Sequence, residues 1–269
     1  MDGDRTDTVG AAAVAVLSTA APARKVALTA IAAAAWQAGT LAADGAVSPP
    51  DRPARPERPV LLAPREMPKR RKAGGPASRV AMIHALAHIE LNAIDLAWDI
   101  VARFGAAMPR AFTTDWIGVA ADEARHFDLL SRHLAALGAD YGALPAHDGL
   151  WQAAQETAHD VLARLAVVPM ILEARGLDVT PAIIAALEQA GDREGAAALR
   201  LIGEEEVGHV AIGCRWFEQV CDHRGLDPAP TWQVLVQRHF RGHLRRPFNL
   251  TARLRAGFLP HYYEPIASD

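Results

Sequence analysis

Cysteine is scarce in this chain of 269 residues, which contains only Cys214 and Cys221. Because the two would lie two turns apart on one predicted helix, their Cα atoms would be about 10 Å apart, too far for a disulfide. No second cysteine pair accompanies them, which disfavours a thiolate metal site. We expect two buried free thiols and no disulfide-stabilised scaffold.

A large net charge and a long apolar run are missing as well. The formal net charge is -3, from 28 basic and 31 acidic side chains, so the chain has no global basic field for nucleic acid. Pro22, Arg24 and Lys25 interrupt the Ala-rich segment 9–36, which is therefore not expected to span a bilayer. The N-terminal sequence MDGDRTD is acidic and lacks the pattern of a signal peptide. These absences favour a cytoplasmic protein without a membrane partner.

Proline and glycine divide a chain that is otherwise rich in helical patterns. With 51% hydrophobic residues it can bury a substantial core, and the periodicity predicts an all-α fold. Residues 1–44 read as an Ala-rich helical hairpin with helices at 7–19 and 22–38, and residues 45–77 as a Pro/Arg-rich connector whose proline density excludes helix and sheet. Residues 78–225 are predicted to form a four-helix bundle, and residues 226–269 a helix followed by a wrapping tail.

Capping residues and glycines set the expected helix ends within the bundle. The predicted helices cover residues 78–104, 113–137, 148–175 and 192–223, with Ser78, Thr113 or Thr114, and Asp192 as N-caps. The connection 138–150 is long enough to cross the full length of a helix, as in bundles with one long crossover. We expect the third helix to break near residues 176–180 and to resume with Thr180 as its cap.

Two short phrases place a carboxylate and an imidazole on one helical face. They are Glu123-Ala-Arg-His126 and Glu206-Val-Gly-His209, each with a spacing of three residues, one turn apart. A single Glu-x-x-His is common and usually forms a solvated surface pair. Two copies on successive apolar helix faces favour a metal site instead.

Two further glutamates, Glu90 and Glu173, stand alone on apolar faces. The positions one and two turns from Glu90 are all uncharged: Ile83, Leu86, Ala87, Ile94 and Ala97. A buried carboxylate costs several kcal/mol unless a positive charge lies beside it, so four on inward faces are hard to explain without metal. The residues therefore predict a site that holds two metal ions.

The same residues lie in stretches that resemble a known family. The phrases HALAHIELNAIDLAWD, DEARHF, LEARGLDVTP and EEEVGHVAIGCRWF, with RRPFN and ARLRAGF near the C-terminus, resemble a ferritin-like family catalogued as domain of unknown function 455. The resemblance is nearly full length. It implies a ferritin-like four-helix bundle and, through a superfamily that includes di-iron tRNA hydroxylases, ferritins and monooxygenase subunits, a dinuclear iron or iron/manganese centre that reacts with O2. Carried over by position, the metal ligands fall on Glu90, Glu123, His126, Glu173, Glu206 and His209.

The expected chemistry follows from the donor set. Carboxylates with one imidazole per metal suit iron or manganese, as Fe/Fe, Fe/Mn or Mn/Mn pairs. We expect an oxygen-activating oxidase or hydroxylase on an unidentified organic substrate, with RNA or a nucleotide among the candidates and no catalytic residues beyond the ligands. An electron-donor protein and a second copy of the chain are candidate partners. Two alternatives stay open: a ferroxidase or iron-binding protein without organic substrate, and a helical interaction module whose site has lost activity.

Other polar residues carry weaker interpretations. Asp95, Asp122 and Glu205 are candidates to orient the two histidine ligands. His84 and His88 are expected to be surface or hydrogen-bonded residues, and His159, His239 and His243 are not expected to bind metal. The tail residues Arg245, Arg246, Arg253 and Arg255, with Phe248, Tyr262 and Tyr263, could bind a phosphorylated substrate or RNA, although a solvated strap is the favoured reading. Gly203, Gly208 and Gly213 fit close helix packing and a pocket equally well, and the lack of tyrosine in the four bundle helices disfavours a stored tyrosyl radical.

Overall fold

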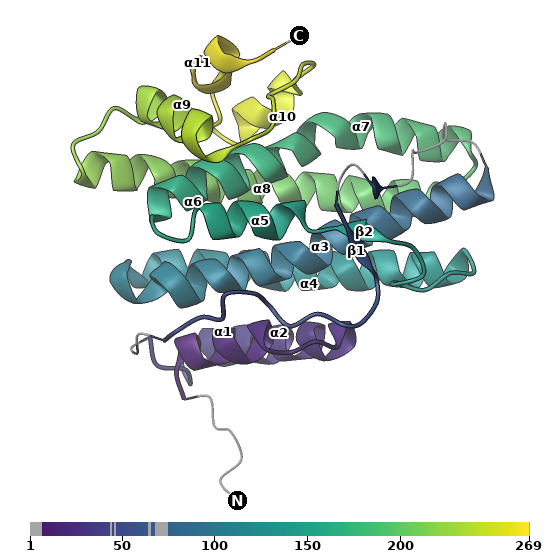
Figure 1. Cartoon of the computed structure of the whole chain (residues 1–269), viewed down its shortest axis with the longest axis horizontal. Coiled ribbons are helices and arrows are strands. Elements are labelled where there is room, and N and C mark those ends of the chain that lie inside the picture. Colours follow the sequence, from purple (N-terminus) through teal and green to yellow (C-terminus); the bar gives the residue numbers. More distant parts are fainter. Residues whose placement is uncertain (1–6, 44, 46, 64–65, 68–74, 269) are drawn as a thin grey trace, which may run out of the picture. The chain divides into compact units, whose positions relative to one another are not determined.

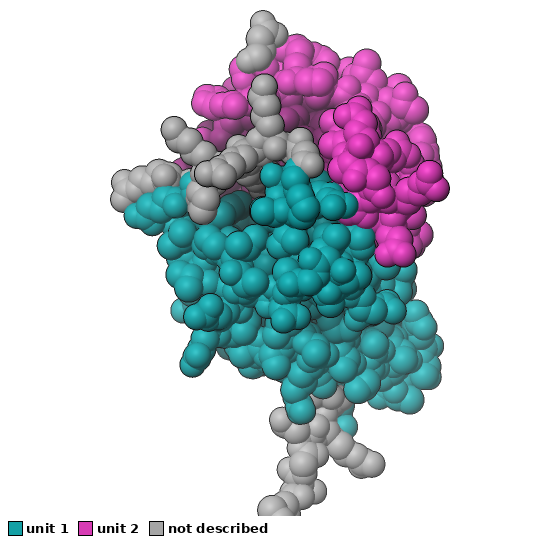
Figure 2. Space-filling view, turned by 90° about the vertical axis from the view of Figure 1, so that its right-hand side faces the viewer, with its two compact units in different colours: residues 1–151 teal, residues 152–269 magenta. Residues whose placement is uncertain are grey.

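The computed structural model describes residues 7–43, 45, 47–63, 66–67 and 75–268. Its described secondary structure is almost entirely helical (Figure 1), so the predicted all-α class is confirmed. By their contacts, residues 1–151 and 152–269 form two compact units (Figure 2). The four-part division predicted from the sequence stays a prediction.

The first unit begins with the predicted helical hairpin. Helices α1 (Val9–Leu17) and α2 (Pro22–Gln37) agree with the expected ranges, and they pack on α3 and α4 respectively (Figure 1). Two tryptophans fix this packing: Trp36 Nε1 donates to Thr114 Oγ1 at 3.0 Å, and Trp98 Nε1 donates to Thr29 Oγ1 at 3.0 Å. The hairpin is therefore an integral layer of this unit.

Helices α3 (Pro76–Phe104) and α4 (Arg110–Ala136) form the core of the first unit, joined by the short 3-10 turn η2 (Gly105–Ala107). Their C-terminal ends agree with the prediction. Their predicted N-caps are wrong, because α3 starts directly after Gly75 and α4 directly after Pro109. Pro76 occupies the first turn of α3, where its missing N–H costs no hydrogen bond, so the helix starts before Ser78.

One helix of this unit meets the criteria for a membrane span by length and composition. It is α3 with the turn after it, Pro76–Ala107, and 67% of its most apolar window is buried inside the structure. Such burial is typical of the core helix of a soluble protein.

The Pro-rich connector forms a small piece of sheet, which corrects the expectation that its proline density excludes one. Strand β1 (Leu61–Leu62) pairs in parallel with β2 (Ala146–His147), with Leu61 opposite Ala146. The ladder is possible because Val60, Leu61 and Leu62 form a short run without proline and keep their N–H groups.

The second unit is built around one long helix. Helix α8 (Arg193–His223) starts at the predicted cap, where the Asp192 side chain accepts from the Gly195 N–H at 2.9 Å. Helix α7 (Ala174–Gln189), the π-helix η3 (Val168–Glu173) and α6 (Val161–Val167) pack against α8. The other elements are α5 (Gly149–Glu156), which contains the boundary between the units, α9 (Pro228–His239), α10 (Leu250–Arg255), α11 (Pro260–Tyr263) and the 3-10 helix η4 (Glu264–Ile266).

The predicted break of the third helix at residues 176–180 is wrong. Helix α7 continues through Thr180 and Pro181. Proline cannot donate to the carbonyl four residues earlier, but Asn249 Nδ2 donates to that carbonyl, Leu177 O, at 3.1 Å. The interruptions lie earlier in the chain, at residues 157–160, where Asp160 caps α6, and in η3, which contains Pro169.

Candidate metal centre

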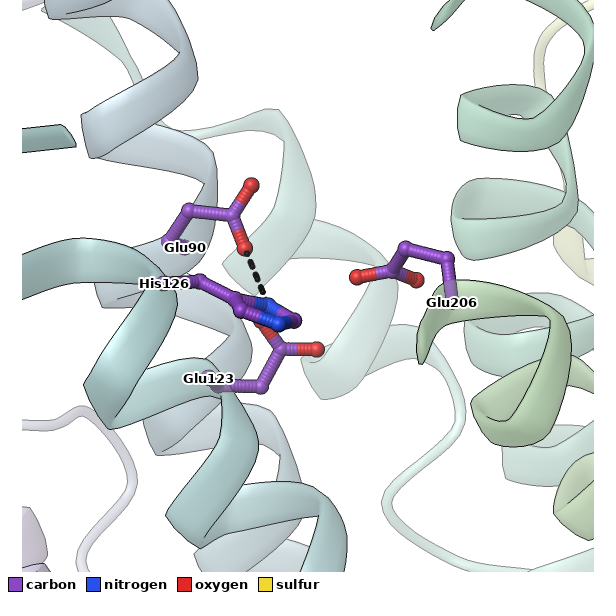
Figure 3. Close-up of side chains that lie close together, drawn as sticks. All are labelled: Glu90, Glu123, His126 and Glu206. Atoms are coloured by element: carbon purple, nitrogen blue, oxygen red, sulfur yellow. Dashed lines mark ion pairs between the residues drawn. The ribbon is translucent and has the colours of Figure 1, made fainter. Parts of the chain in front are cut away.

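Helices α3 and α4 place two carboxylates and an imidazole inside the first unit. Glu90 is 5% exposed, and Glu123 and His126 are 0% exposed. Their neighbours on the same helix faces, such as Ala87 and Phe127, are buried apolar residues. The three side chains point toward one another from the two helices (Figure 3). The inward orientation predicted from the periodicity is therefore confirmed for these residues.

His126 is the centre of this group. Its Nδ1 lies 3.4 Å from Glu123 Oε2 and 3.5 Å from Glu90 Oε2. One potential ligand atom from each of the three residues lies within 4.8 Å of the others. Two carboxylate oxygens and one imidazole nitrogen at such separations could hold a metal ion.

The electrostatics of the group favour a positive charge. Burial alone lowers the pKa of His126, but the carboxylates of Glu123 and Glu90 outweigh this and raise it to about 11. The metal-free group is thus most stable with a proton on His126, which balances part of the negative charge. A divalent cation would supply more charge at the same place.

The second unit contains the other Glu-x-x-His pair, on α8. His209 Nδ1 lies 3.5 Å from Glu206 Oε1, and His209 is 2% exposed. The same ring nitrogen faces the glutamate as in the first pair, because both pairs have the same spacing on a helix. Glu206, which Figure 3 also draws, is partly buried. Glu173 ends η3, the π-helix that packs against α8.

A glycine on α8 allows η3 to approach closely. A Cβ atom at Gly213 would lie 2.4 Å from the Pro169 Cβ, and one at Gly203 would lie 3.1 Å from the Thr180 Cγ2. A Cβ at Gly208 would meet nothing within 4 Å. The structure therefore explains Gly213 and Gly203 by close packing, and it gives no reason for Gly208.

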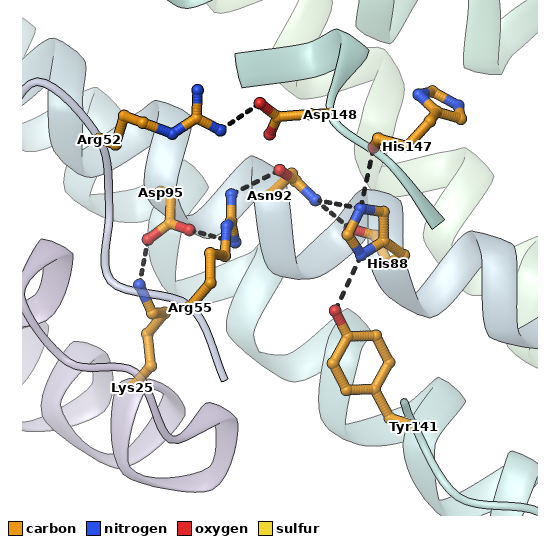
Figure 4. Close-up of polar contacts among 9 residues, drawn as sticks. All are labelled: Lys25, Arg52, Arg55, His88, Asn92, Asp95, Tyr141, His147 and Asp148. Carbon is orange, nitrogen blue, oxygen red and sulfur yellow. Dashed lines mark hydrogen bonds and ion pairs between the residues drawn. The ribbon is translucent and has the colours of Figure 1, made fainter. Parts of the chain in front are cut away.

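Two of the residues predicted to orient the histidine ligands have other partners. Asp95 is fully buried and forms ion pairs with Lys25 and with Arg55, the latter at 2.6 Å (Figure 4). Asp122 pairs with Arg125 at 2.5 Å on the exposed side of α4. The sequence did not reveal these partners of Asp95, because Lys25 and Arg55 come from the hairpin and the connector.

His84 and His88 belong to a buried hydrogen-bonded network rather than to the surface. His88 Nε2 donates to His147 O at 3.1 Å, so its Nδ1 accepts from the Tyr141 hydroxyl at 2.8 Å (Figure 4). Burial lowers the pKa of His88 to about 4 and leaves the ring neutral. His84 Nε2 accepts from the Gly142 N–H at 2.9 Å.

Three arginines of the C-terminal tail, Arg246, Arg253 and Arg255, are bound within the chain. Arg253 is 1% exposed, donates to both carboxylate oxygens of Asp178 at 2.9 and 2.7 Å, and lies over the rings of Phe248 and Tyr263. Arg255 pairs with Glu204, and Arg246 with Glu264. The expectation of a solvated strap is therefore wrong for Arg253 and Tyr263, which are buried. Binding of RNA or a phosphorylated substrate stays a prediction.

Both cysteines are buried free thiols, as predicted. Burial is the main cause that raises the pKa of Cys214 to about 12 and that of Cys221 to about 11. Thiols that stay protonated at neutral pH are poor metal ligands.

Comparisons with known proteins add a family and a relative. The model of a family described as "Protein of unknown function (DUF455)" matches residues 18–264. An uncharacterized protein of Haemophilus influenzae is 42% identical over 212 residues, which cover 77% of this chain and 73% of the relative. No solved structure matches the chain.

Proposed function

The chain belongs to the DUF455 family, and for this member we propose an oxygen-dependent oxidase or hydroxylase with a dinuclear iron or iron/manganese centre. The observation that carries the proposal is the buried group of Glu90, Glu123 and His126, whose potential ligand atoms lie within 4.8 Å of one another. Buried carboxylates that converge on one imidazole are expensive for stability alone, so a function that uses them is favoured.

We propose that the six predicted ligands form one dinuclear centre. They fall into two sets: Glu90, Glu123 and His126 on α3 and α4, and Glu173, Glu206 and His209 on η3 and α8. Each set contains two carboxylates and one imidazole, and in both sets a histidine Nδ1 faces a glutamate oxygen at 3.4 or 3.5 Å. The resemblance to ferritin-like bundles supports this arrangement, because four helices in such bundles aim the same residue types at one interior point.

The donor atoms fit iron or manganese. Carboxylate oxygens are hard ligands and imidazole is intermediate, whereas the two cysteines are buried and protonated. When bound, such a metal pair supplies the electrons that reduce O2 and the oxidising power that acts on a substrate C–H bond. The electrons must be returned after each turnover, so an electron-donor protein is part of the proposal.

The protein residues hold the metals, exclude water and accommodate a proton. The buried neighbours of the ligands keep solvent away from the first set, since Trp116 is 1% and Phe127 5% exposed. The proton that the metal-free protein keeps on His126 must leave when Nδ1 becomes a ligand. Metal binding is therefore expected to release protons at neutral pH.

The proposal is tested by metal analysis of protein purified without O2 and loaded with Fe(II). We expect two iron ions per chain, and about one fewer in Glu123→Gln, which keeps the shape of the side chain and removes its charge. Glu188→Gln is a matched control, because Glu188 is an exposed partner of Arg200. Wild-type protein that retains no iron or manganese would refute the proposal.

The organic substrate is tested with labelled oxygen. The loaded protein is given 18O2 and either a small-molecule extract or an RNA extract, and the products are analysed by mass spectrometry. A hydroxylase incorporates the label into an organic product, whereas an oxidase consumes O2 in proportion to an oxidised compound. Consumption of O2 in proportion to added iron alone, with no organic product, would support the ferroxidase alternative.

A further inference from the structure

Two histidines that are far apart in the sequence meet in the second unit. His159 lies in the turn before α6, and His239 is the last residue of α9. Their ring centroids are 5.1 Å apart, with an angle of 48° between the planes. His159 is exposed and His239 is partly exposed, so solvent ions can reach the pair.

The packing of α9 on α6 brings the two rings together. Trp232 Nε1 donates to Ala166 O at 3.2 Å and fixes the register of the two helices. Because they run in opposite directions, a step of seven residues forward from Trp232 and seven back from Ala166 leads to His239 and His159. Trp232 is 0% exposed, so the meeting of the two histidines depends on a buried contact.

The separation suits two imidazoles on one ion. A zinc–nitrogen bond of about 2.0–2.1 Å places the ring centroid about 3.2 Å from the metal. At a tetrahedral angle, two such rings have centroids about 5 Å apart. The observed centroid distance of 5.1 Å agrees with this value.

Two carboxylates, those of Glu156 and Asp160, lie close enough to His239 to act on it electrostatically. Glu156 pairs with Arg241 at 2.6 Å, and Asp160 pairs with Arg224 at 2.8 Å. Glu156 is therefore a candidate for a third ligand.

We propose that His159 and His239 form a second metal site, which binds a divalent transition ion such as Zn(II), Ni(II) or Cu(II) with Glu156 as a third ligand. The site is independent of the proposed iron centre. It would connect the turn before α6 to the end of α9, and Arg241 would compete with the ion for Glu156. Imidazole ligands favour these ions over Mg(II) and Ca(II).

The test uses Cu(II) and full-length protein. We compare the wild type with the double variant His159→Asn/His239→Asn and with the control variant His243→Asn. His243 is a matched control because it is an exposed histidine four residues after His239. Equilibrium dialysis should give one bound Cu(II) fewer in the double variant and no change in the control. Each single variant should bind this copper at least about tenfold more weakly. Even the loss of a residue that only orients a metal ligand lowers metal affinity by about tenfold or more. Electron paramagnetic resonance of this copper should show two nitrogen ligands in the wild type.

Two outcomes would overturn the site: equal copper stoichiometry in the wild type and the double variant, or a signal with fewer than two nitrogens. Arg241→Gln should strengthen binding, because it frees Glu156, and weaker binding in that variant would exclude Glu156 as a ligand. Thermal melts without metal verify that the variants fold. The double variant should take up as much iron as the wild type, because the histidine pair is not part of the proposed iron centre.

Discussion

His126 lies between two glutamate carboxylates in a part of the first unit that excludes water. A carboxylate loses much of its solvation when it is buried, and two of them also repel each other. The imidazolium form of His126 relieves part of this cost, which is why its pKa rises to about 11. At the residue scale, the group is built to attract positive charge.

Glu123 should matter more for iron binding than for the stability of the protein. Glu123→Gln should weaken binding of Fe(II) to the first unit at least about tenfold, because it removes a ligand charge. Urea unfolding of the metal-free protein should show a loss of no more than about 1 kcal/mol, since one buried repulsion disappears as well. A large loss of stability with unchanged iron binding would show that Glu123 is a structural residue and not a ligand.

The buried His84 should make the free energy of unfolding depend on pH. Burial lowers the pKa of His84, and its Nε2 accepts the Gly142 N–H, so the folded protein keeps this ring neutral. Below pH 6.5 the unfolded chain takes up a proton that the folded chain does not, so the free energy of unfolding falls as the pH falls from 6.5 toward the lowered pKa.

His84→Gln keeps an acceptor near the same place and removes the titration. In that pH range, its free energy of unfolding should depend on pH less steeply than in the wild type, by up to about 1.4 kcal/mol per pH unit. The neighbouring His88, also kept neutral by burial, contributes to the slope that remains. Denaturant unfolding between pH 4 and 7 measures this, and equal slopes in both proteins would contradict the assignment.

At the scale of elements, the contact of η3 with α8 determines where Glu173 lies. Pro169, four residues before Glu173, lies against Gly213, four residues after His209. Any side chain at position 213 would push the two elements apart. π-helices are rare, and those that occur are often found at functional sites. Here the π-helix η3 ends at Glu173, a proposed ligand.

Gly213→Ala and Gly208→Ala form a matched pair for this contact. Gly213→Ala should destabilise the protein by about 1–3 kcal/mol through overpacking, and it should lower the iron content by displacing Glu173. Gly208→Ala should stabilise it by up to about 1 kcal/mol, because its Cβ meets nothing and alanine favours helix. Urea unfolding and metal analysis give both readouts, and similar effects of the two changes would contradict the packing.

Sequence patterns predicted some of these elements well and others poorly, for physical reasons. Helix ends at Gly105 and Gly138 and the Asp192 cap are local signals, and they were confirmed. The Leu177 carbonyl, which has no helical donor at Pro181, is bound by Asn249, a distant residue, and no local rule reveals this contact. The inward orientation of Glu90 and Glu123 could be predicted because their apolar neighbours repeat with the helical period.

At the scale of the whole molecule, buried ion pairs join segments that look separable in the sequence. Lys25 of α2 is 1% exposed and pairs with Asp95 of α3, which Arg55 of the connector also contacts. Hairpin, connector and bundle helix therefore stabilise one another within the first unit. Sequence patterns do not reveal such pairs, because ion pairs between distant segments have no periodic spacing.

Lys25→Met should cost about 3 kcal/mol or more of unfolding free energy, because Asp95 would stay buried with less compensating charge. The double variant Lys25→Met/Asp95→Asn should recover part of this loss. Urea denaturation of the wild type, the single variants Lys25→Met and Asp95→Asn, and the double variant measures the coupling. A single variant as stable as the wild type would show that the pair contributes nothing.

If the proposed function is right, Glu90, Glu123, His126, Glu173, Glu206 and His209 hold two metal ions in one centre. Iron K-edge X-ray absorption of the anaerobically loaded protein tests it most directly. We expect oxygen and nitrogen ligands, with about one imidazole per iron, and a second iron about 3.5–4 Å away. Iron with no metal neighbour, or a spectrum unchanged in Glu123→Gln, would contradict it.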